Sequence, residues 1–389
     1  MRIALVSFSH HHTIFLEHLC HLFSGPGFYL EVFGTREQYE NMLYEKKKYF
    51  KKIKWHFYDE LTSDMYPGLR NRLNDFDLIF IPTLRAHLEF FAQGGFRPPL
   101  LLCIHNINYW FDSHKPAAWS DWFVFPRGTK NRKKLKSQIL NRVSIVNLFN
   151  PSMDSFLPAG HKFIITHLPF SYYIPTKLPH LLKTAPASPV KIVVPGQIVD
   201  NRKDYGPILQ AFKLAGKSFS CPYELHFLGR FNCSWQTKDR LLRQARKLNS
   251  PNLRLVFYQD KLSLSGILAD PIYDRVMSSA SCLLSAQNNR GLKLFKGSRE
   301  YFGETAASGL SFEALRFVKP AVFGPDHECL TALEPAAIRY VNIEDLAEKL
   351  LQFQDDKYTA AQIRRIAAVS IDFTRPRIIT RFRSQLRTI

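Results

Sequence analysis

The chain has 389 residues, of which 46% are hydrophobic and 14% aromatic, and a formal net charge of +20. This composition supplies ample apolar surface for globular domains, and no repeat or low-complexity tract is visible, so disordered chains and repeat arrays are excluded. The length favours two domains over a single core. The excess of positive charge favours polyanionic partners, namely nucleic acid, an anionic membrane face or phosphorylated substrates, and does not choose among them.

Targeting segments and cysteine pairs are not evident. The apolar run within residues 2–8 is too short for a signal peptide, and no later run approaches the ~20 residues of a spanning helix. The cysteines are scattered, without a C-x-x-C pair, so we expect reduced thiols rather than disulfides or a zinc site. These patterns predict a cytoplasmic protein. The cysteines are Cys20, Cys103, Cys221, Cys233, Cys282 and Cys329.

The positive charge is spread along the chain. Residues 1–190 carry 23 Lys and Arg against 14 Asp and Glu, and residues 191–389 carry 30 against 19. Because both halves are basic, no single tail explains the net charge.

In the first half, short apolar runs rich in strand formers alternate with helical or loop stretches. The run at 2–8 is followed by a polar turn and by "TIFLEHLCHLF", whose apolar residues recur at helical spacing. Continuous apolar strands that alternate with helices predict a parallel sheet covered on both faces. The predicted strands span residues 2–8, 28–34, 76–83, 99–106, 143–150 and 162–169.

The same alternation restarts after a break. Residues 171–189 hold four prolines without periodicity, which is typical of an interdomain linker. Strands and helices then alternate again from residue 190. We therefore predict an α/β protein with two doubly wound, Rossmann-like domains, at 1–170 and 190–370. Their parallel sheets would face a cleft between their carboxyl ends, where such folds bind ligands.

The stretch "VVPGQIVDNRKDYGPILQAF" at 193–212 places two cations in a strand-to-helix loop. Arg202 and Lys203 follow a buried strand that ends at Gly196, and a helix begins near Tyr205. Cations beside a helix N-terminus suit a diphosphate, because backbone N–H groups and the helix dipole add to the side-chain charge. An ordinary loop with two solvated charges is an equal reading of this motif alone.

The stretch "ETAASGLSFEALRFVKPAVFG" at 304–324 begins with small residues and continues as a helix. A turn that includes Ser308 and Gly309 lets phosphates approach the backbone at the helix start. Glu313, about one turn into the helix, is placed to accept hydrogen bonds from paired ribose hydroxyls. A helix-N-terminal acid favoured by the dipole is the alternative.

Taken in order, these motifs resemble the donor-binding domain of a GT-B glycosyltransferase. The segments "PGQIVDNRKDYGPILQAF", "LHFLGR", "YDRVMSSASCLLSAQ" and "SFEALRFVKPAVFG" are similar to the pattern of the large retaining family 4, over about residues 190–350. The resemblance implies a metal-independent enzyme that moves a sugar from a nucleotide-diphosphate donor, its co-substrate, without a further cofactor. It also implies that a C-terminal helix, here at 371–389, crosses back to the first domain.

The resemblance assigns donor-binding roles to individual residues. Glu313 matches the glutamate that binds the nucleotide ribose, and Arg202 or Lys203 matches the basic residue that holds the diphosphate. The chain departs from the family at Gln197, which replaces an arginine. It departs again at Thr305, which stands where the first glutamate of E-x7-E would fall.

The family places that first glutamate near the donor sugar. Glu304 lies one position too early to match it, so Thr305 and Glu304 are both candidates for sugar contacts. The arginine that Gln197 replaces leaves the donor site with one positive charge fewer. The basic loop "RGLKLFKGSRE" could supply that charge through Lys293, Lys296 or Arg299, and a solvated loop is the equal alternative.

Residues of the first half are candidates for catalysis and acceptor binding. His105 ends a buried strand in "LLCIHNINYWF", where it is placed to accept a proton or to stabilise charge, and a structural histidine is the equal alternative. Asn106 and the aromatic cluster 109–111 are placed to line an acceptor site. The triplet 10–12 occupies the first strand-to-helix loop, which faces the cleft in GT-B enzymes, and is read as an acceptor-side lip. Its members are His10, His11 and His12.

Metal ligation is not predicted. The triplet 10–12 lacks an obvious carboxylate or cysteine partner, and His18 and His21 lie on the following helix. Asp75 and Asp77 form a D-x-D sequence, but they stand just before a strand, at the end opposite the cleft. Cations and a helix N-terminus would instead neutralise the leaving diphosphate.

Three basic stretches remain, at 44–57, 127–142 and 375–387. The first mixes six lysines with aromatic residues, as membrane-surface and nucleic-acid segments do. For a glycosyltransferase the anionic membrane face ranks higher, because lipid-linked acceptors lie there. A solvated charged face is the common alternative.

The sequence thus predicts a cytoplasmic, peripheral membrane glycosyltransferase of cell-surface polysaccharide or glycoconjugate synthesis. Its partners would be a nucleotide sugar and a glycan or lipid-linked acceptor, and nucleic acid is not expected. Two rival functions stay open: a sugar-nucleotide epimerase on a similar two-domain layout, and a basic nucleic-acid-binding protein.

Overall fold

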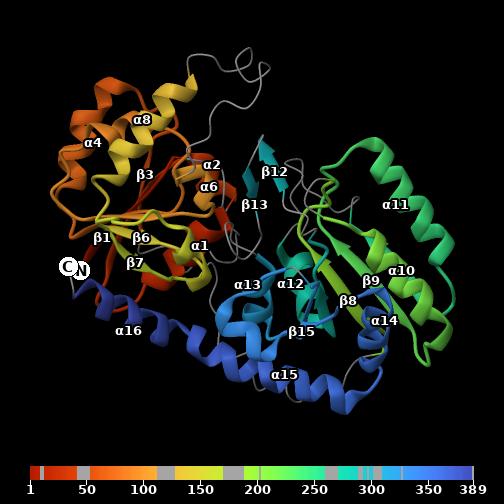
Figure 1. The fold of residues 1–389 in the computed structure, drawn as a ribbon. Helices are drawn as coiled ribbons and strands as arrows, with labels where there is room; N and C mark the ends of the chain where they lie inside the picture. Colours follow the sequence, from red (N-terminus) through yellow and green to blue (C-terminus); the bar gives the residue numbers. More distant parts are fainter. Residues whose placement is uncertain are drawn as a thin grey trace.

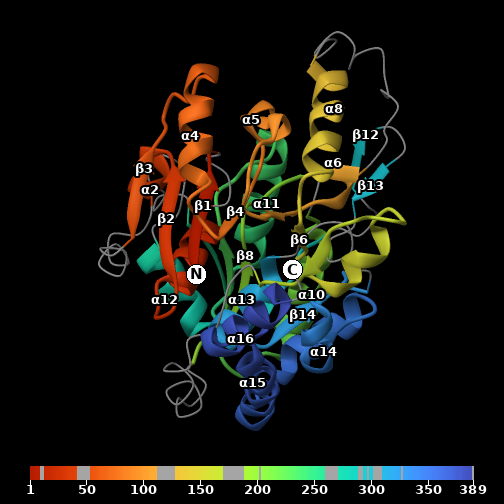
Figure 2. The same cartoon turned by 90° about the vertical axis from the view of Figure 1, so that its left-hand side faces the viewer.

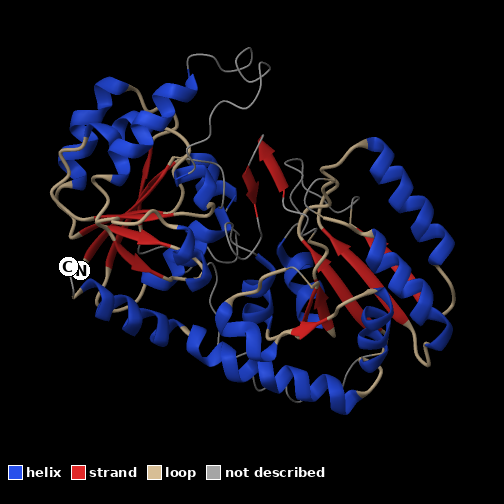
Figure 3. Cartoon of the chain, viewed as in Figure 1, coloured by secondary structure: helices blue, strands red, loops and turns tan. Residues whose placement is uncertain are grey.

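The computed structural model contains two parallel β-sheets, each with helices on both faces (Figures 1 and 3). This arrangement confirms the predicted α/β fold with two doubly wound domains. The described residues are 1–8, 13–41, 53–111, 128–169, 188–200, 203–258, 270–287, 292–295, 298–300, 309–325 and 327–387.

The first half contributes the seven-stranded sheet. Its strands are β1 (Arg2–Ser7), β2 (Tyr29–Gly34), β3 (Lys54–Phe57), β4 (Leu78–Ile81), β5 (Leu100–Cys103), β6 (Ile145–Asn147) and β7 (Ile164–Thr166). Its helices are α1 (Thr13–Phe23), α2 (Arg36–Asn41), α4 (Tyr66–Leu73), α5 (Leu88–Gln93), α6 (Ile107–Phe111) and α8 (Gly128–Leu140), with 3-10 turns η2 (Ser63–Met65) and η3 (Pro151–Phe156).

The second half contributes the six-stranded sheet and a separate two-stranded hairpin. Its strands are β8 (Val190–Pro195), β9 (Tyr223–Leu228), β10 (Leu253–Phe257), β11 (Cys282–Leu284), β12 (Leu292–Phe295), β13 (Ser298–Glu300), β14 (Ala321–Phe323) and β15 (Ile338–Arg339). Its helices are α10 (Gly206–Ala215), α11 (Trp235–Leu248), α12 (Asp270–Ser279), α13 (Gly309–Phe317), α14 (Ile343–Gln352), α15 (Asp356–Ser370) and α16 (Arg375–Leu386), with 3-10 turns η5 (Gly216–Ser218), η7 (Thr331–Ala336) and η8 (Ile371–Phe373).

Strand order places a topological switch point in each sheet. The first sheet runs β3-β2-β1-β4-β5-β6-β7 and the second runs β10-β9-β8-β11-β14-β15, with all pairs parallel. The chain therefore reverses its direction of winding beside β1 and again beside β8. Crevices at the carboxyl ends of strands beside such points are where open α/β sheets bind ligands.

Burial on both faces explains why the strand sequences are continuously apolar. All four residues of β4 and of β5 are buried, as are the last five residues of β1. A strand covered on one face alone would alternate apolar and polar residues. The continuous runs thus encode the two helix layers around each sheet.

Two segments differ from their sequence interpretation. Residues 54–57, within the basic stretch 44–57, form the edge strand β3, and the Trp55 ring packs against Tyr39 at 5.1 Å between centroids. Residues 42–52 lie outside the described part of the chain. The predicted loop around Lys293 contains instead the antiparallel hairpin β12–β13, in which Lys293 pairs with Arg299.

The last two helices run from the second half to the first. In Figure 1, α15 and α16 pass along the lower edge of both halves. Phe382 of α16 is fully buried and its ring lies 5.2 Å from that of Phe23 in α1. Arg375 Nε donates to the Leu22 carbonyl at 2.9 Å. Part of the basic stretch 375–387 is therefore used to join α16 to the first half.

No helix among the described segments combines the length and hydrophobicity that crossing a bilayer requires.

Candidate functional site

The turn after β8 brings two strands of the second sheet into close contact. Gly196 has a φ of +84°, a conformation that residues with a Cβ rarely adopt. A Cβ on Gly229, which follows β9, would lie 2.4 Å from the Gly196 carbonyl oxygen. Both glycines are therefore required by the geometry of this edge, and Gly229 was not singled out from the sequence.

Lys203 stands at the same carboxyl edge. Its Nζ donates to the Pro195 carbonyl at 2.8 Å, and its backbone forms a β-bridge with Gln287, just beyond β11. The Asp204 N–H donates to the Ala286 carbonyl at 2.8 Å. These bonds hold the ammonium group between the ends of β8 and β11, at the switch point of the second sheet.

A second cation, which sequence reasoning missed, lies beside this turn. The Arg230 guanidinium, at the end of β9, lies 3.2 Å from the carboxamide of Gln197. The sequence comparison with the family showed only that Gln197 replaces an arginine. The carboxyl-end rule applied to β9 would have identified Arg230, because that residue directly follows the "LHFLG" strand.

Glu313 lies on α13 and is mostly buried. Its side chain is 15% exposed, and Oε2 lies 3.9 Å from Arg316 Nη1. Arg316 also binds Asp274 of α12 at 3.2 Å. Burial alone would lower the pKa of Arg316, but the carboxylates of Glu313 and Asp274 raise it. A permanently charged guanidinium therefore lies beside the Glu313 carboxylate. Gly309, also predicted here, is the first residue of α13 and is exposed.

His105 follows β5 at the carboxyl edge of the first sheet. Its Nε2 lies 2.9 Å from the Pro82 carbonyl, which can only accept, so Nε2 carries the proton and the lone pair lies on Nδ1. Burial lowers the pKa of His105 to about 4, with the Arg85 charge acting in the same direction and the Pro82 carbonyl opposing it. The imidazole is thus neutral near pH 7.

Phe149 joins the two halves at this level. Its ring lies 4.7 Å from that of His105 and 6.2 Å from that of Phe312, the residue before Glu313. Phe149 is 2% exposed. The structure therefore brings His105 and α13, distant in the sequence, into contact with the same buried aromatic ring.

Asn106 and the aromatic cluster that follows it have partners of their own. Asn106 Oδ1 accepts from the Tyr109 N–H at 3.1 Å, which caps α6. Lys136 Nζ, from α8, donates to the Tyr109 carbonyl at 2.6 Å and lies 3.2 Å from the centroid of its ring. Trp110 is 8% exposed. The hairpin β12–β13 lies beside α6 in both Figure 1 and Figure 2, so a backbone element of the second half approaches this cluster.

Several predicted site residues lie outside the described part of the chain. Nothing is therefore assigned to them beyond the sequence prediction. They are His10, His11, His12, Arg202, Glu304, Thr305 and Ser308.

The two aspartates of the D-x-D sequence lie at the edge that does not hold these residues. Asp77 directly precedes β4, and its Oδ2 accepts from the Arg2 N–H at 2.6 Å. No group of three or more metal-ligating side chains gathers among the residues that the structure describes. Asp77 therefore ends the turn that joins α4 to β4.

Asn150 makes hydrogen bonds between the two halves. Its Oδ1 accepts from the backbone and the hydroxyl of Thr331 at 3.1 and 2.8 Å, and its Nδ2 donates to the Cys329 carbonyl at 3.2 Å. The residue is 4% exposed. Leu330, between these partners, donates its N–H to Ser311 of α13 at 3.1 Å. Asn150 thus links the end of β6 to the loop that supports α13.

We expect Asn150→Ala to lower the free energy of unfolding by about 1–3 kcal/mol, because it removes the hydrogen bonds that the buried Asn150 carboxamide makes to Thr331 and Cys329. Urea unfolding followed by circular dichroism measures this loss. Asn141→Ala, at an exposed position, is the matched control and should change stability by less than about 0.5 kcal/mol. Equal effects of the two substitutions would show that the contact between the halves contributes nothing.

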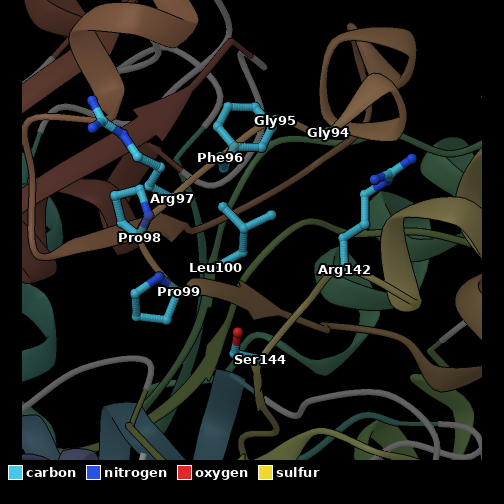
Figure 4. Close-up of a pocket in the computed structure, with 9 residues that line it drawn as sticks. All are labelled: Gly94, Gly95, Phe96, Arg97, Pro98, Pro99, Leu100, Arg142 and Ser144. Atoms are coloured by element: carbon cyan, nitrogen blue, oxygen red, sulfur yellow. The ribbon is translucent and has the colours of Figure 1, made fainter.

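A cavity of about 300 Å³ lies elsewhere, at the amino ends of β5 and β6 (Figure 4). It is lined in part by Gly94, Phe96, Pro99, Arg142 and Ser144. The side chains of Arg97 and Arg142 point away from one another in Figure 4. The cavity is on the edge of the first sheet opposite His105, so it is separate from the candidate site.

Comparisons with known proteins place this geometry in a known fold. No protein-family model and no curated protein sequence matches the chain. Solved structures do match over whole chains, which confirms the predicted GT-B fold. HepE of Anabaena, in complex with UDP-glucose, has 15% sequence identity and a TM-score of 0.60, with 100% of both chains covered.

Two further solved structures resemble the chain over its whole length. A trehalose-6-phosphate protein of E. coli bound with UDP-2-fluoro glucose has 11% identity and a TM-score of 0.57, covering 100% of this chain and 99% of that one. UDP-GlcNAc 2-epimerase of Neisseria meningitidis, bound to UDP-GlcNAc, has 12% identity and a TM-score of 0.54, with full coverage of both.

Proposed function

We propose that this protein is a glycosyltransferase that moves a sugar from a UDP-sugar to an acceptor hydroxyl. The observation that carries the proposal is the placement of Lys203 and Glu313 in the second half and His105 in the first, with Phe149 in contact with both His105 and α13. The complexes of similarly folded proteins with UDP-sugars support the choice of nucleotide.

In the proposed donor site, Lys203 and Arg230 bind the diphosphate from two adjacent strand ends. Glu313 accepts hydrogen bonds from the ribose hydroxyls. Arg202, Ser308 and the N-terminus of α13 at Gly309 complete the diphosphate site, and Glu304 or Thr305 contacts the sugar. These cations and backbone dipoles neutralise the leaving UDP, so the reaction needs no metal ion.

In the proposed acceptor site, His105 acts as a neutral hydrogen-bonding group. Its Nδ1 lone pair accepts a hydrogen bond from a substrate hydroxyl, while Nε2 stays bound to Pro82. A base with a pKa of about 4 is too weak to hold a proton near pH 7. Asn106 and the lip at His10, His11 and His12 contact the acceptor.

The family, the stereochemistry and the acceptor class of the enzyme are inferred from the sequence resemblance. We infer a member of family 4 that transfers with retention of anomeric configuration. The acceptor is a glycan or a lipid-linked sugar of cell-surface polysaccharide or glycoconjugate synthesis, reached from the cytoplasmic membrane face. Nucleic acid is not a partner.

A sugar-nucleotide epimerase is the second candidate. The structural likeness to UDP-GlcNAc 2-epimerase favours it as the alternative, because the fold is shared by both kinds of enzyme. An epimerase requires acid and base groups around the sugar. In the first half, the sequence indicates His105 and the triplet 10–12 as the candidates for that set, which is a small set for an epimerase and favours transfer.

A product assay separates these functions. The protein is incubated with UDP-glucose or UDP-GlcNAc, with and without a lipid extract as the acceptor source, and sugar and nucleotide products are resolved by mass spectrometry. We expect UDP release and a glycosylated acceptor that form only when the extract is present. A sugar epimer formed without any acceptor would contradict transfer and establish the epimerase.

A further inference from the structure

The outer face of α11 exposes one large aromatic side chain. Trp235, the first residue of the helix, is 73% exposed, whereas Trp110 is 8% exposed. The Trp235 ring makes no hydrogen bond and no ring contact with the residues that the structure describes. An exposed indole of this kind contributes nothing to the packing of the protein on its own.

The start of α11 is fixed in place. Ser234 caps the helix, since its Oγ accepts from the Thr237 N–H at 3.3 Å, and its own N–H donates to Asp200 Oδ2 at 2.6 Å. Leu241 and Ala245 are buried against the second sheet. Trp235 is therefore held outward by a capped and anchored helix rather than by a frayed end.

The same face is strongly basic. The helix carries five Lys and Arg residues and one acid, Asp239, which pairs with Arg243 at 2.6 Å. Arg246 and Lys247 are exposed and have no carboxylate partner within the described residues. Lys238 is half-buried and lies 5.6 Å from the centroid of the Phe231 ring, so the exposed cations of this face are Arg240, Arg243, Arg246 and Lys247.

Trp235 follows Arg230 of the candidate site closely in the chain. The segment from Arg230 to Trp235 leaves the carboxyl end of β9, the edge of the second sheet at which Lys203 lies. Figure 1 shows α11 on the outside of the second half, away from α15 and α16. A surface that met α11 would therefore lie alongside the edge at which the donor is proposed to bind.

We propose that the outer face of α11, with Trp235 and its cations, binds an anionic membrane surface. Indole rings favour the boundary between head groups and acyl chains, and juxtaposed cations are attracted to anionic lipids. Single-stranded nucleic acid is the less suitable partner, because its binding sites use grooves with several stacked aromatic side chains and this face presents one. The inference deepens the proposed function, since it names the surface that brings a lipid-linked acceptor to the enzyme.

Vesicle flotation with the full-length protein tests this surface. We expect wild type to float with vesicles of equimolar phosphatidylcholine and phosphatidylglycerol, and not with phosphatidylcholine alone. Arg246→Glu with Lys247→Glu should weaken this binding about tenfold or more, and Trp235→Ser should also weaken it. Arg364→Glu with Arg377→Glu is the control, because it changes net charge equally at exposed positions of α15 and α16.

The possible results distinguish binding through the α11 face from binding through net charge alone, and they also distinguish failure of this proposal from failure of the proposed enzyme function. Equal losses in the two double variants, or no preference of wild type for anionic vesicles, would overturn the proposal. So would an oligonucleotide that binds more tightly than the vesicles and is lost through the α11 substitutions. UDP titration of the same variants tests the proposed function independently of the vesicle experiment. If none of the proteins binds UDP, the proposed function is contradicted and the vesicle result remains valid.

Discussion

Glu313→Ala should lower the affinity of the protein for UDP by about 10- to 150-fold, as expected for the loss of a hydrogen bond to a charged group. The carboxylate is mostly buried on α13, so water cannot easily replace it as the acceptor for ribose hydroxyls. Calorimetric titration of UDP into the wild type and the variant measures the change. UMP should show a similar fold loss, since the interaction is with the ribose.

The control for this experiment is Glu344→Ala, which removes an exposed acid from the first turn of α14. It should leave UDP affinity unchanged. Arg316 keeps Asp274 as a partner at 3.2 Å, so Glu313→Ala should remain folded by circular dichroism. A folded Glu313→Ala protein with wild-type affinity for UDP would remove Glu313 from the donor site.

His105→Ala should lower kcat of sugar transfer by about 10- to 100-fold and leave the affinity for UDP unchanged. The reason is that His105 lies on the first half, where it would contact the acceptor or the sugar and not the nucleotide. His105→Asn should recover part of the rate, because its carboxamide oxygen can replace Nδ1 as an acceptor. Steady-state kinetics on the three proteins measure this order, and a kcat of His105→Ala equal to wild type would make His105 a structural residue.

The low pKa of His105 has a pH signature. The group protonates near pH 4 in the folded protein and near 6.5 when unfolded, so its contribution to stability is present above about pH 6.5 and is lost as pH falls toward 4. It also adds no break to the rate profile between about pH 5 and 8. A rate that follows a histidine of ordinary pKa, and that loses this dependence in His105→Asn, would contradict the neutral role.

The fold could be predicted because its strands are buried on both faces. Runs such as "FDLIFIPT" are continuously apolar, and that pattern requires a covered parallel sheet. The position of His105 followed from the same reasoning, since a polar residue after a buried strand lies at the carboxyl edge. The edge strand β3 was missed because its lysine-rich context obscured the aromatic residues that pack on Tyr39.

The contacts between the halves could not be predicted. Asn150 and Thr331 are far apart in the sequence, and neither belongs to a motif, so nothing local indicates their hydrogen bonds. The contacts of Phe149 could not be predicted either, because an aromatic residue at the end of a strand is found in hydrophobic cores as often as in binding sites. Arg230 is different, because its position directly after β9 could be predicted from the sequence. Its proximity to Gln197 could not be predicted, and that proximity is what indicates a second cation at this turn.

The central claim is that Lys203 and Glu313, both in the second half, bind a nucleoside diphosphate. The most direct test is calorimetric titration of wild-type protein with UDP, UMP and uridine, each in the presence of EDTA. We expect UDP to bind more tightly than UMP, and uridine to bind weakly, because in the proposed site Lys203 and Arg230 contact the diphosphate without a metal ion. An absence of UDP binding, together with oligonucleotide binding that falls steeply with salt, would contradict the account and favour a nucleic-acid-binding protein.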